Sequence, residues 1–247
     1  MKKQYKKAFE TLGLLKYELL LLTLILFIIE VVVIKFFSSL DPSVMTDERL
    51  RNTLDNIFGN YDIDLTSIRF QWWMIFTWIK YFVYNSVIDL IAVCIGFIPF
   101  YFLDLGIINQ NAMSIGYSIG IMTLAGNNVW EIILRAYLPH GIFEIPANMV
   151  SQLLGLYLCY NTTKWWSVKF ARYYIKNEQS DIDKSIRKKP VNPQMLKVSQ
   201  YEIDGIVGKC FWDCMRVYGL IVLPLLLIAS PIEAYVVPIL MNIKLGG

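Results

Sequence analysis

The chain has 247 residues, of which 56% are hydrophobic and 17% are charged, and its mean hydropathy is +0.47. This composition excludes a disordered protein, a disulfide-stapled secreted miniprotein and an ordinary soluble enzyme. The net charge of +3 provides no strong basic field, so nucleic acid is not an expected partner. Because the apolar residues are grouped in long runs, we predict an all-α polytopic membrane protein that has the lipid bilayer around it.

Five segments meet the requirement of about 20 mostly apolar residues for a spanning helix. They cover residues 19–37, 81–102, 107–124, 140–160 and 217–237. The third is short and more polar, so a half-span that turns back is the alternative for it. The sequence shows no internal repeat, and we predict a single membrane domain over residues 1–247. Lys35 interrupts the place where a signal-peptide cleavage site would lie, so the first helix is predicted to be retained.

The distribution of Lys and Arg predicts the orientation. Four lysines in the first seven residues place the N-terminus inside. The segment 38–71 has six acids and three bases and is predicted to be an outer loop containing a short amphipathic helix. The segment 161–209 has ten bases and five acids and is predicted to be an inner loop. Within it we expect a flexible link over 177–193, followed by an amphipathic helix on the inner leaflet.

Polar side chains inside the predicted spans form the main functional hypothesis, because an ionisable group there costs about 2.5–3.5 kcal/mol. The set comprises Glu30, Asn85, Asp89, His140, Glu144, Asn148 and Glu233. His140, Glu144 and Asn148 recur every four residues, so they share one face of a helix. Counted along the spans, these residues fall in the outer half of the bilayer, which predicts a shared polar cluster there. Pro146 is expected to kink the fourth span.

Three interpretations of this cluster remain open. The favoured one is a structural network that fixes helix packing. The second is a recognition cleft for a peptide or a partner helix. The third is catalysis or metal binding, for which His140, Glu144 and Glu233 are the candidates. Because the chain has one histidine and no HExxH motif, we predict no catalytic residue, no metal and no cofactor.

Small residues recur every four positions in the third span, at Ala112, Gly116 and Gly120. Such a stripe lets another helix approach closely. Packing within the chain is favoured over dimerisation, while homo-oligomerisation stays open as an alternative.

Two blocks resemble the stage II sporulation protein M family. The block Leu138–Ala147, LPHGIFEIPA, resembles the family's PHG signature with a following Glu and Pro-Ala. The block Ile232–Pro238, IEAYVVP, resembles its IEA ending. Asn85 and the stretch from Asn111 to Gly116 also fit, although the family more often has Asn-Gly at the latter. The motif residues coincide with His140, Glu144 and Glu233.

The resemblance implies a multi-pass protein of the bacterial cytoplasmic membrane. One family context is sporulation, where such a protein anchors a peptidoglycan-degrading complex. The other is circular bacteriocin gene clusters, where a homologue serves maturation, export or immunity. We therefore expect a non-enzymatic component that anchors or assembles other membrane or exported proteins. The alternative is a bacteriocin-maturation component, including an intramembrane peptidase or ligase that uses His140, Glu144 and Glu233.

Overall fold

The computed structural model describes residues 2–39, 72–124, 128–185 and 193–242, for some helical stretches as backbone only. These residues form helices and short connections, with no strand among them. The elements are α1 (Lys2–Leu14), α2 (Lys16–Ser38), α4 (Trp72–Ile95), α5 (Tyr101–Leu124), α6 (Val129–Ile132), η3 (Ile133–Tyr137), α7 (Leu138–Ser185), α8 (Pro193–Val217), η4 (Tyr218–Val222), α9 (Leu223–Pro231), η5 (Ile232–Val236) and α10 (Val237–Asn242). The predicted outer-loop helix falls in 40–71, outside the described residues.

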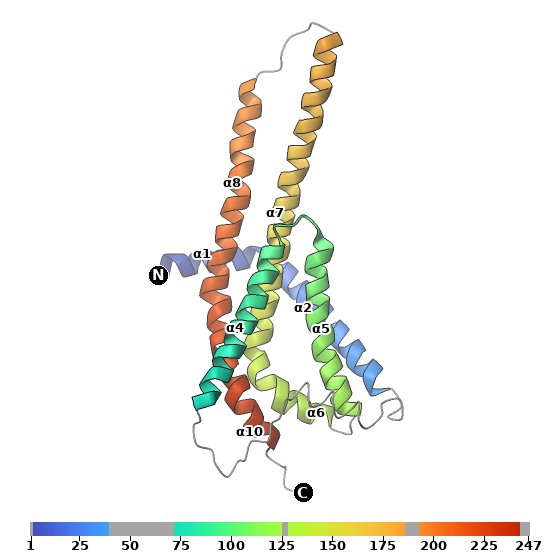
Figure 1. Ribbon diagram of the computed structural model, residues 1–247, viewed down its shortest axis with the longest axis vertical. Helices are drawn as coiled ribbons and strands as arrows, with labels where there is room; N and C mark the ends of the chain where they lie inside the picture. Colours follow the sequence, from blue (N-terminus) through green and yellow to red (C-terminus); the bar gives the residue numbers. More distant parts are fainter. Residues whose placement is uncertain (1, 40–71, 125–127, 186–192, 243–247) are drawn as a thin grey trace.

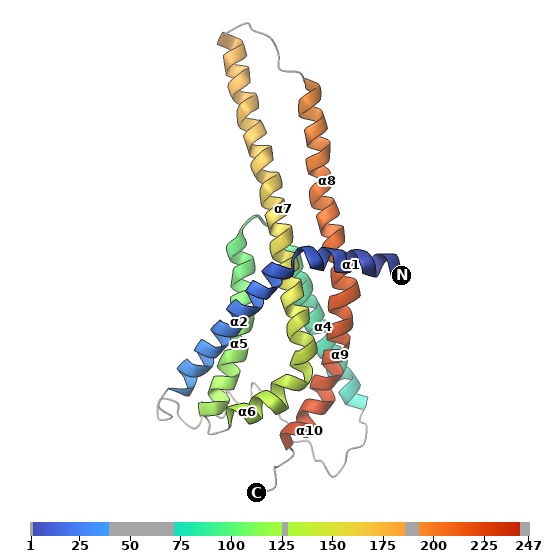
Figure 2. The same cartoon turned by 180° about the vertical axis from the view of Figure 1, so that it is seen from behind.

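Figures 1 and 2 show α2, α4, α5, α7 and α9 running along the length of the molecule. We call the end that carries α6 and α10 the α6 end. At the opposite end, the α1 end, α1 crosses the bundle and meets α2 at an elbow. Beyond α1, the helices α7 and α8 continue side by side as a projecting pair, which we call the arm.

Four helical stretches in the described part of the chain are long and apolar enough to cross a membrane: Lys16–Phe37, Ile75–Ile95, Val129–Phe170 and Gly205–Val236. They overlap the first, second, fourth and fifth predicted spans, so the expectation of an all-α polytopic membrane protein is confirmed. The predicted third span corresponds to α5, which is not among the four. α5 nevertheless extends over 24 residues beside α2 and runs in the same direction.

The second span lies earlier in the chain than predicted. α4 begins at Trp72 rather than near 81, and it ends at Ile95 rather than near 102. After Ile95 the backbone tightens, with Gly96, Phe97 and Ile98 each donating to the carbonyl three positions before. Pro99 prevents α4 from continuing, because proline lacks an N–H and disfavours the helical conformation of the residue before it.

The inner segment is far more helical than predicted. α7 continues without a break to Ser185, so a flexible link over 177–193 is wrong for 177–185, and 186–192 lie outside the described residues. α8 leads directly through η4 into α9, so the predicted helix on the inner leaflet is instead the upper part of the last span. Charged and polar residues continue both helices beyond the apolar candidate spans, which end at Phe170 in α7 and begin at Gly205 in α8.

Each of the three π-helical segments ends two residues before a proline. The segments η3, η4 and η5 precede Pro139, Pro224 and Pro238. In each case the residue after the segment donates its N–H to the carbonyl five positions before, as Leu138 does to Ile133. A proline ring crowds the carbonyl four positions before it, and a wider turn relieves that clash. Pro146, by contrast, lies inside α7.

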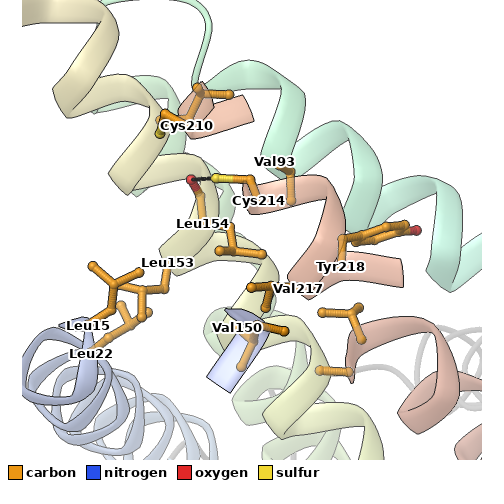
Figure 3. Packing of buried hydrophobic residues seen from close by; sticks show 14 of the residues in the cluster. Leu15, Leu22, Val93, Val150, Leu153, Leu154, Cys210, Cys214, Val217 and Tyr218 are labelled. Atoms are coloured by element: carbon orange, nitrogen blue, oxygen red, sulfur yellow. Dashed lines mark hydrogen bonds between the residues drawn. The ribbon is translucent and has the colours of Figure 1, made fainter. Parts of the chain in front are cut away.

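The main hydrophobic core joins α7 to α2, α4, α8 and α9. Leu153 and Leu154 on α7 contact apolar side chains from several of these helices, with Leu22 and Cys214 among them (Figure 3). The Cys214 thiol, fully buried, donates to the carbonyl of Leu154 at 3.7 Å. The cysteines are free thiols. α7 is therefore the central helix on which the others pack.

Glycines set the closest helix approaches. A Cβ at Gly116 would lie 2.9 Å from Cβ of Val33, and one at Gly120 would lie 2.5 Å from Cβ of Phe37. The two glycines thus let α5 pack against α2 of the same chain. Ala112 lies on α5, but its side chain is outside the described part. Gly96 makes a second close approach, where an added methyl group would overlap the carbonyl oxygen of Gly155 on α7.

Replacing Gly96 with alanine is expected to lower the free energy of unfolding by about 1–3 kcal/mol, because α4 must move away from α7. The measurement is the unfolding midpoint of the purified protein in detergent, followed by circular dichroism. Gly219→Ala is the matched control, since a Cβ there would meet nothing within 4 Å. Equal midpoints for the two variants would contradict the close approach.

Candidate functional site

The polar residues of α4 and α7 meet in a regular register. Both helices run from the α6 end to the α1 end, so they form a parallel pair. The amide of Asn85 donates to Oε1 of Glu144 at 3.2 Å. One turn further, the amide nitrogen of Asn148, oriented toward α4, donates to both carboxyl oxygens of Asp89 at 3.0 and 3.1 Å. Both pairs are 59 positions apart in the chain, as are Gly96 and Gly155.

Asp89 is the most deeply buried acid of the group. Only 1% of its surface is exposed, and Ser151, whose hydroxyl donates to the carbonyl of Ala147, lies beside it. Asn148 also lies close to Glu144, one turn away on α7. In lipid no water can satisfy such groups, and each partner therefore offsets a desolvation cost.

His140 lies one turn before Glu144, with its Nε2 3.8 Å from Oε2 of that glutamate. Pro139 and the π turn of η3 determine where this stretch begins, because they lead the chain from α6 into α7. The imidazole side chain is 15% exposed and that of Glu144 is 21% exposed. The pair is thus accessible near the α6 end, whereas Asp89 is closed off.

Glu233 enters from the last helix, within the π-helical segment η5. Its carboxyl lies close enough to Glu144 for the two charges to repel, and Tyr137 of η3 interacts with it as well. Glu233, Glu144 and Asp89 thus form a column of three carboxyls, which we call the acid column. Three full negative charges at this spacing are unfavourable in a medium of low dielectric constant, so protons or cations must offset them.

Some atoms of the site lack a partner within the described residues. They are Nδ1 of His140, Oε2 of Glu233 and, deeper along α7, Oε1 of Gln152. Among the described residues, no group of three or more His, Cys, Asp or Glu side chains is arranged to hold a metal ion. The arrangement can therefore bind a donor or exchange a proton near the α6 end.

Of the seven residues predicted from the sequence, the structure brings six together. Glu30 is separate: it lies on α2 where that helix packs against α5, and within the described part of the chain its carboxyl joins none of the contacts above. Counting residues along the predicted spans could not show in which direction α2 tilts.

The structure adds residues that the sequence analysis missed. Tyr137 lies beside both Ser118 and Glu233, and Ser151 lies beside Asp89. The Tyr218 hydroxyl donates to the carbonyl of Ser86 at 2.5 Å, which ties η4 to α4. Serines and tyrosines are frequent in spans, and the four-residue spacing after Asn148 leads to Gln152 rather than to Ser151, so the sequence contains no signal for these residues.

These helices and their buried polar column define an α-helical polytopic membrane protein. The family model described as stage II sporulation protein M matches residues 21–238, which include α4, α7 and η5 with all three acids of the column. The chain therefore belongs to the stage II sporulation protein M family. Comparison with curated proteins and with solved structures gave no significant match.

The contact between Asp89 and Asn148 predicts a measurable coupling. In a double-mutant cycle, Asp89→Leu and Asn148→Leu should be less damaging together than the sum of the single changes, with a coupling of about 0.5–1.7 kcal/mol. The measurement is unfolding in mixed micelles by titration with a denaturing detergent.

Ser167→Ala serves as the control partner for Asp89→Leu. Ser167 bonds to Thr163 on its own helix and lies about 28 Å along α7 from Asn148. The two changes should be additive. A coupling as large as that of the first pair would show that the cycle reports general destabilisation.

Proposed function

We propose that this chain is a non-enzymatic component of the bacterial cytoplasmic membrane that anchors or assembles a partner complex. The observation that carries the proposal is the continuity of α7. At about 1.5 Å per residue its 48 residues extend about 72 Å, against a hydrocarbon core of about 30 Å. One uninterrupted helix thus connects the acid column near the α6 end to the arm beyond the α1 end.

Aromatic residues support the position of the membrane surface on α7. Trp166 and Phe170 stack with ring centroids 5.3 Å apart, and the Lys169 ammonium lies 4.4 Å from the centre of the Trp165 ring. Trp165 lies about 40 Å along α7 from its start, a distance close to the full thickness of a bilayer with headgroups. The arm beyond these residues is then in water, where it is available to partners.

In this proposal the α1 end is cytoplasmic and the α6 end faces outward. α1 carries four lysines and lies across the bundle, as expected for a helix on the inner surface. The described residues 161–185 and 193–209, which include the arm, together carry seven bases and five acids. With α5 as a full crossing, the chain crosses five times and its C-terminus is outside.

Single-cysteine labelling tests this topology. In a chain whose native cysteines are replaced by alanine, Asn128→Cys should react with a membrane-impermeant maleimide in intact spheroplasts, because three crossings precede it. Glu10→Cys should react only after permeabilisation. Labelling of both positions from the same side would contradict the orientation or the crossing by α5.

A second candidate is a membrane component of circular bacteriocin maturation, export or immunity that acts as an intramembrane peptidase or ligase. The observation in its favour is the clustering of His140, Glu144 and Glu233, with unpartnered nitrogen and oxygen atoms on two of them. In that case a protonatable group at Glu144 would be indispensable. In an assembly role, the hydrogen bond between Glu144 and Asn85 of α4 would be required, and the titratable group would not.

Two substitutions separate the candidates. Glu144→Gln keeps an acceptor for Asn85 but removes the titratable group, whereas Asn85→Leu removes the contact and keeps the acid. For an assembly role we expect partner recovery to be lost with Asn85→Leu and retained with Glu144→Gln. The measurements, at equal protein level in a host with the native neighbouring genes, are crosslinked-partner recovery and peptide processing. Processing lost with Glu144→Gln while partners are still recovered would overturn the non-enzymatic proposal.

A further inference from the structure

A cavity outside the acid column lies at the α1 end, between the α1–α2 elbow and α7. Its volume is about 660 Å³, within the range of about 300–1,000 Å³ typical of small-molecule sites. The α1–α2 side contributes Leu15, Leu21 and Leu22, and α7 contributes Leu153 and Tyr157. Figure 3 shows Leu15 and Leu22 directed toward Leu153.

The lining is apolar except for one carboxylate and the tyrosine hydroxyls. Glu18, on the first turn of α2, is the acid of the lining. Within the described residues Glu18 forms no ion pair. The nearby Lys16 does not line the cavity, and its ammonium lies 4.8 Å from the centre of the Tyr17 ring. The cavity therefore joins an apolar volume to a single negative charge at one end.

The surroundings identify the occupant as a lipid. α2 exposes apolar side chains on the surface beside the cavity, including Leu21 at 58% and Leu24 at 55%, and in a bilayer these contact acyl chains. An apolar volume that opens to such a surface is filled by the most abundant apolar group available, which is an acyl chain. From Glu18 to Ile25 the lining descends about 10 Å along α2, the direction an acyl chain takes from its headgroup.

We propose that this cavity binds one phospholipid with a primary-amine headgroup. The acyl chain lies between α2 and α7 against Leu22 and Leu153, and the headgroup ammonium pairs with the Glu18 carboxylate. An anionic headgroup would instead place like charges together at Glu18. The lipid would complete the packing of the α1–α2 elbow on α7, a role that the acid column does not share.

The test is native mass spectrometry of the full chain released from nanodiscs that contain equal amounts of phosphatidylethanolamine and phosphatidylglycerol. We expect one phosphatidylethanolamine retained per chain. Leu21→Trp should fill the cavity and abolish retention, while Leu24→Trp, an equally exposed leucine that does not line it, should retain the lipid. Both positions are exposed, so neither change removes a core side chain.

Glu18→Gln tests the headgroup assignment separately. It should reduce the preference for phosphatidylethanolamine over phosphatidylglycerol by about tenfold, equivalent to about 1.4 kcal/mol. Glu10→Gln on α1, also exposed, should leave the preference unchanged. Equal retention by Leu21→Trp and Leu24→Trp, or a peptide retained in place of lipid, would overturn the site. Equal retention of the two lipids by the unsubstituted chain would overturn the amine specificity.

Discussion

The carboxyl–amide contacts between α4 and α7 are the constraint on which the rest of this membrane domain depends. Inside a bilayer no water is available to hydrogen bond a buried carboxyl. Asp89 and Glu144 therefore each need a hydrogen bond from an amide side chain. Because the two contacts are one turn apart on both helices, a single alignment of α4 against α7 forms both of them. A slip of one residue would break both and would carry Gly96 away from Gly155.

The remaining helices are arranged around this parallel pair by proline-linked π turns. η3 connects α6 to α7 just before His140, and η5 contains Glu233, which lies at the same end of the bundle. A π turn shifts the following side chains around the helix axis and leaves backbone carbonyls less regularly paired. Both family signature blocks therefore lie at or directly after a widened turn, where the acid column is closest to the α6 end.

The α2–α5 pair has a different physical basis from the α4–α7 pair. Gly116 and Gly120 of α5 accommodate Val33 and Phe37, so at these positions the two helices pack by shape. Much of α2 is exposed and depends on lipid as its solvent. The proposed lipid site lies where α2 diverges from α7, whereas the arm, which we propose as the partner-anchoring part, is the extension of α7 itself. In this proposal, α7 serves both membrane packing and partner assembly.

The sequence by itself determined the all-α membrane class, the approximate place of four spans, the polar stripe of His140, Glu144 and Asn148, and membership of the family. These follow from composition and from the four-residue repeat, which are local properties of the chain. Only the tertiary structure decided that Asn85 faces Glu144, that Glu30 is separate, and that α7 continues into an arm. Those outcomes depend on the register and tilt of helices packed against each other, which arise from contacts between residues far apart in the sequence.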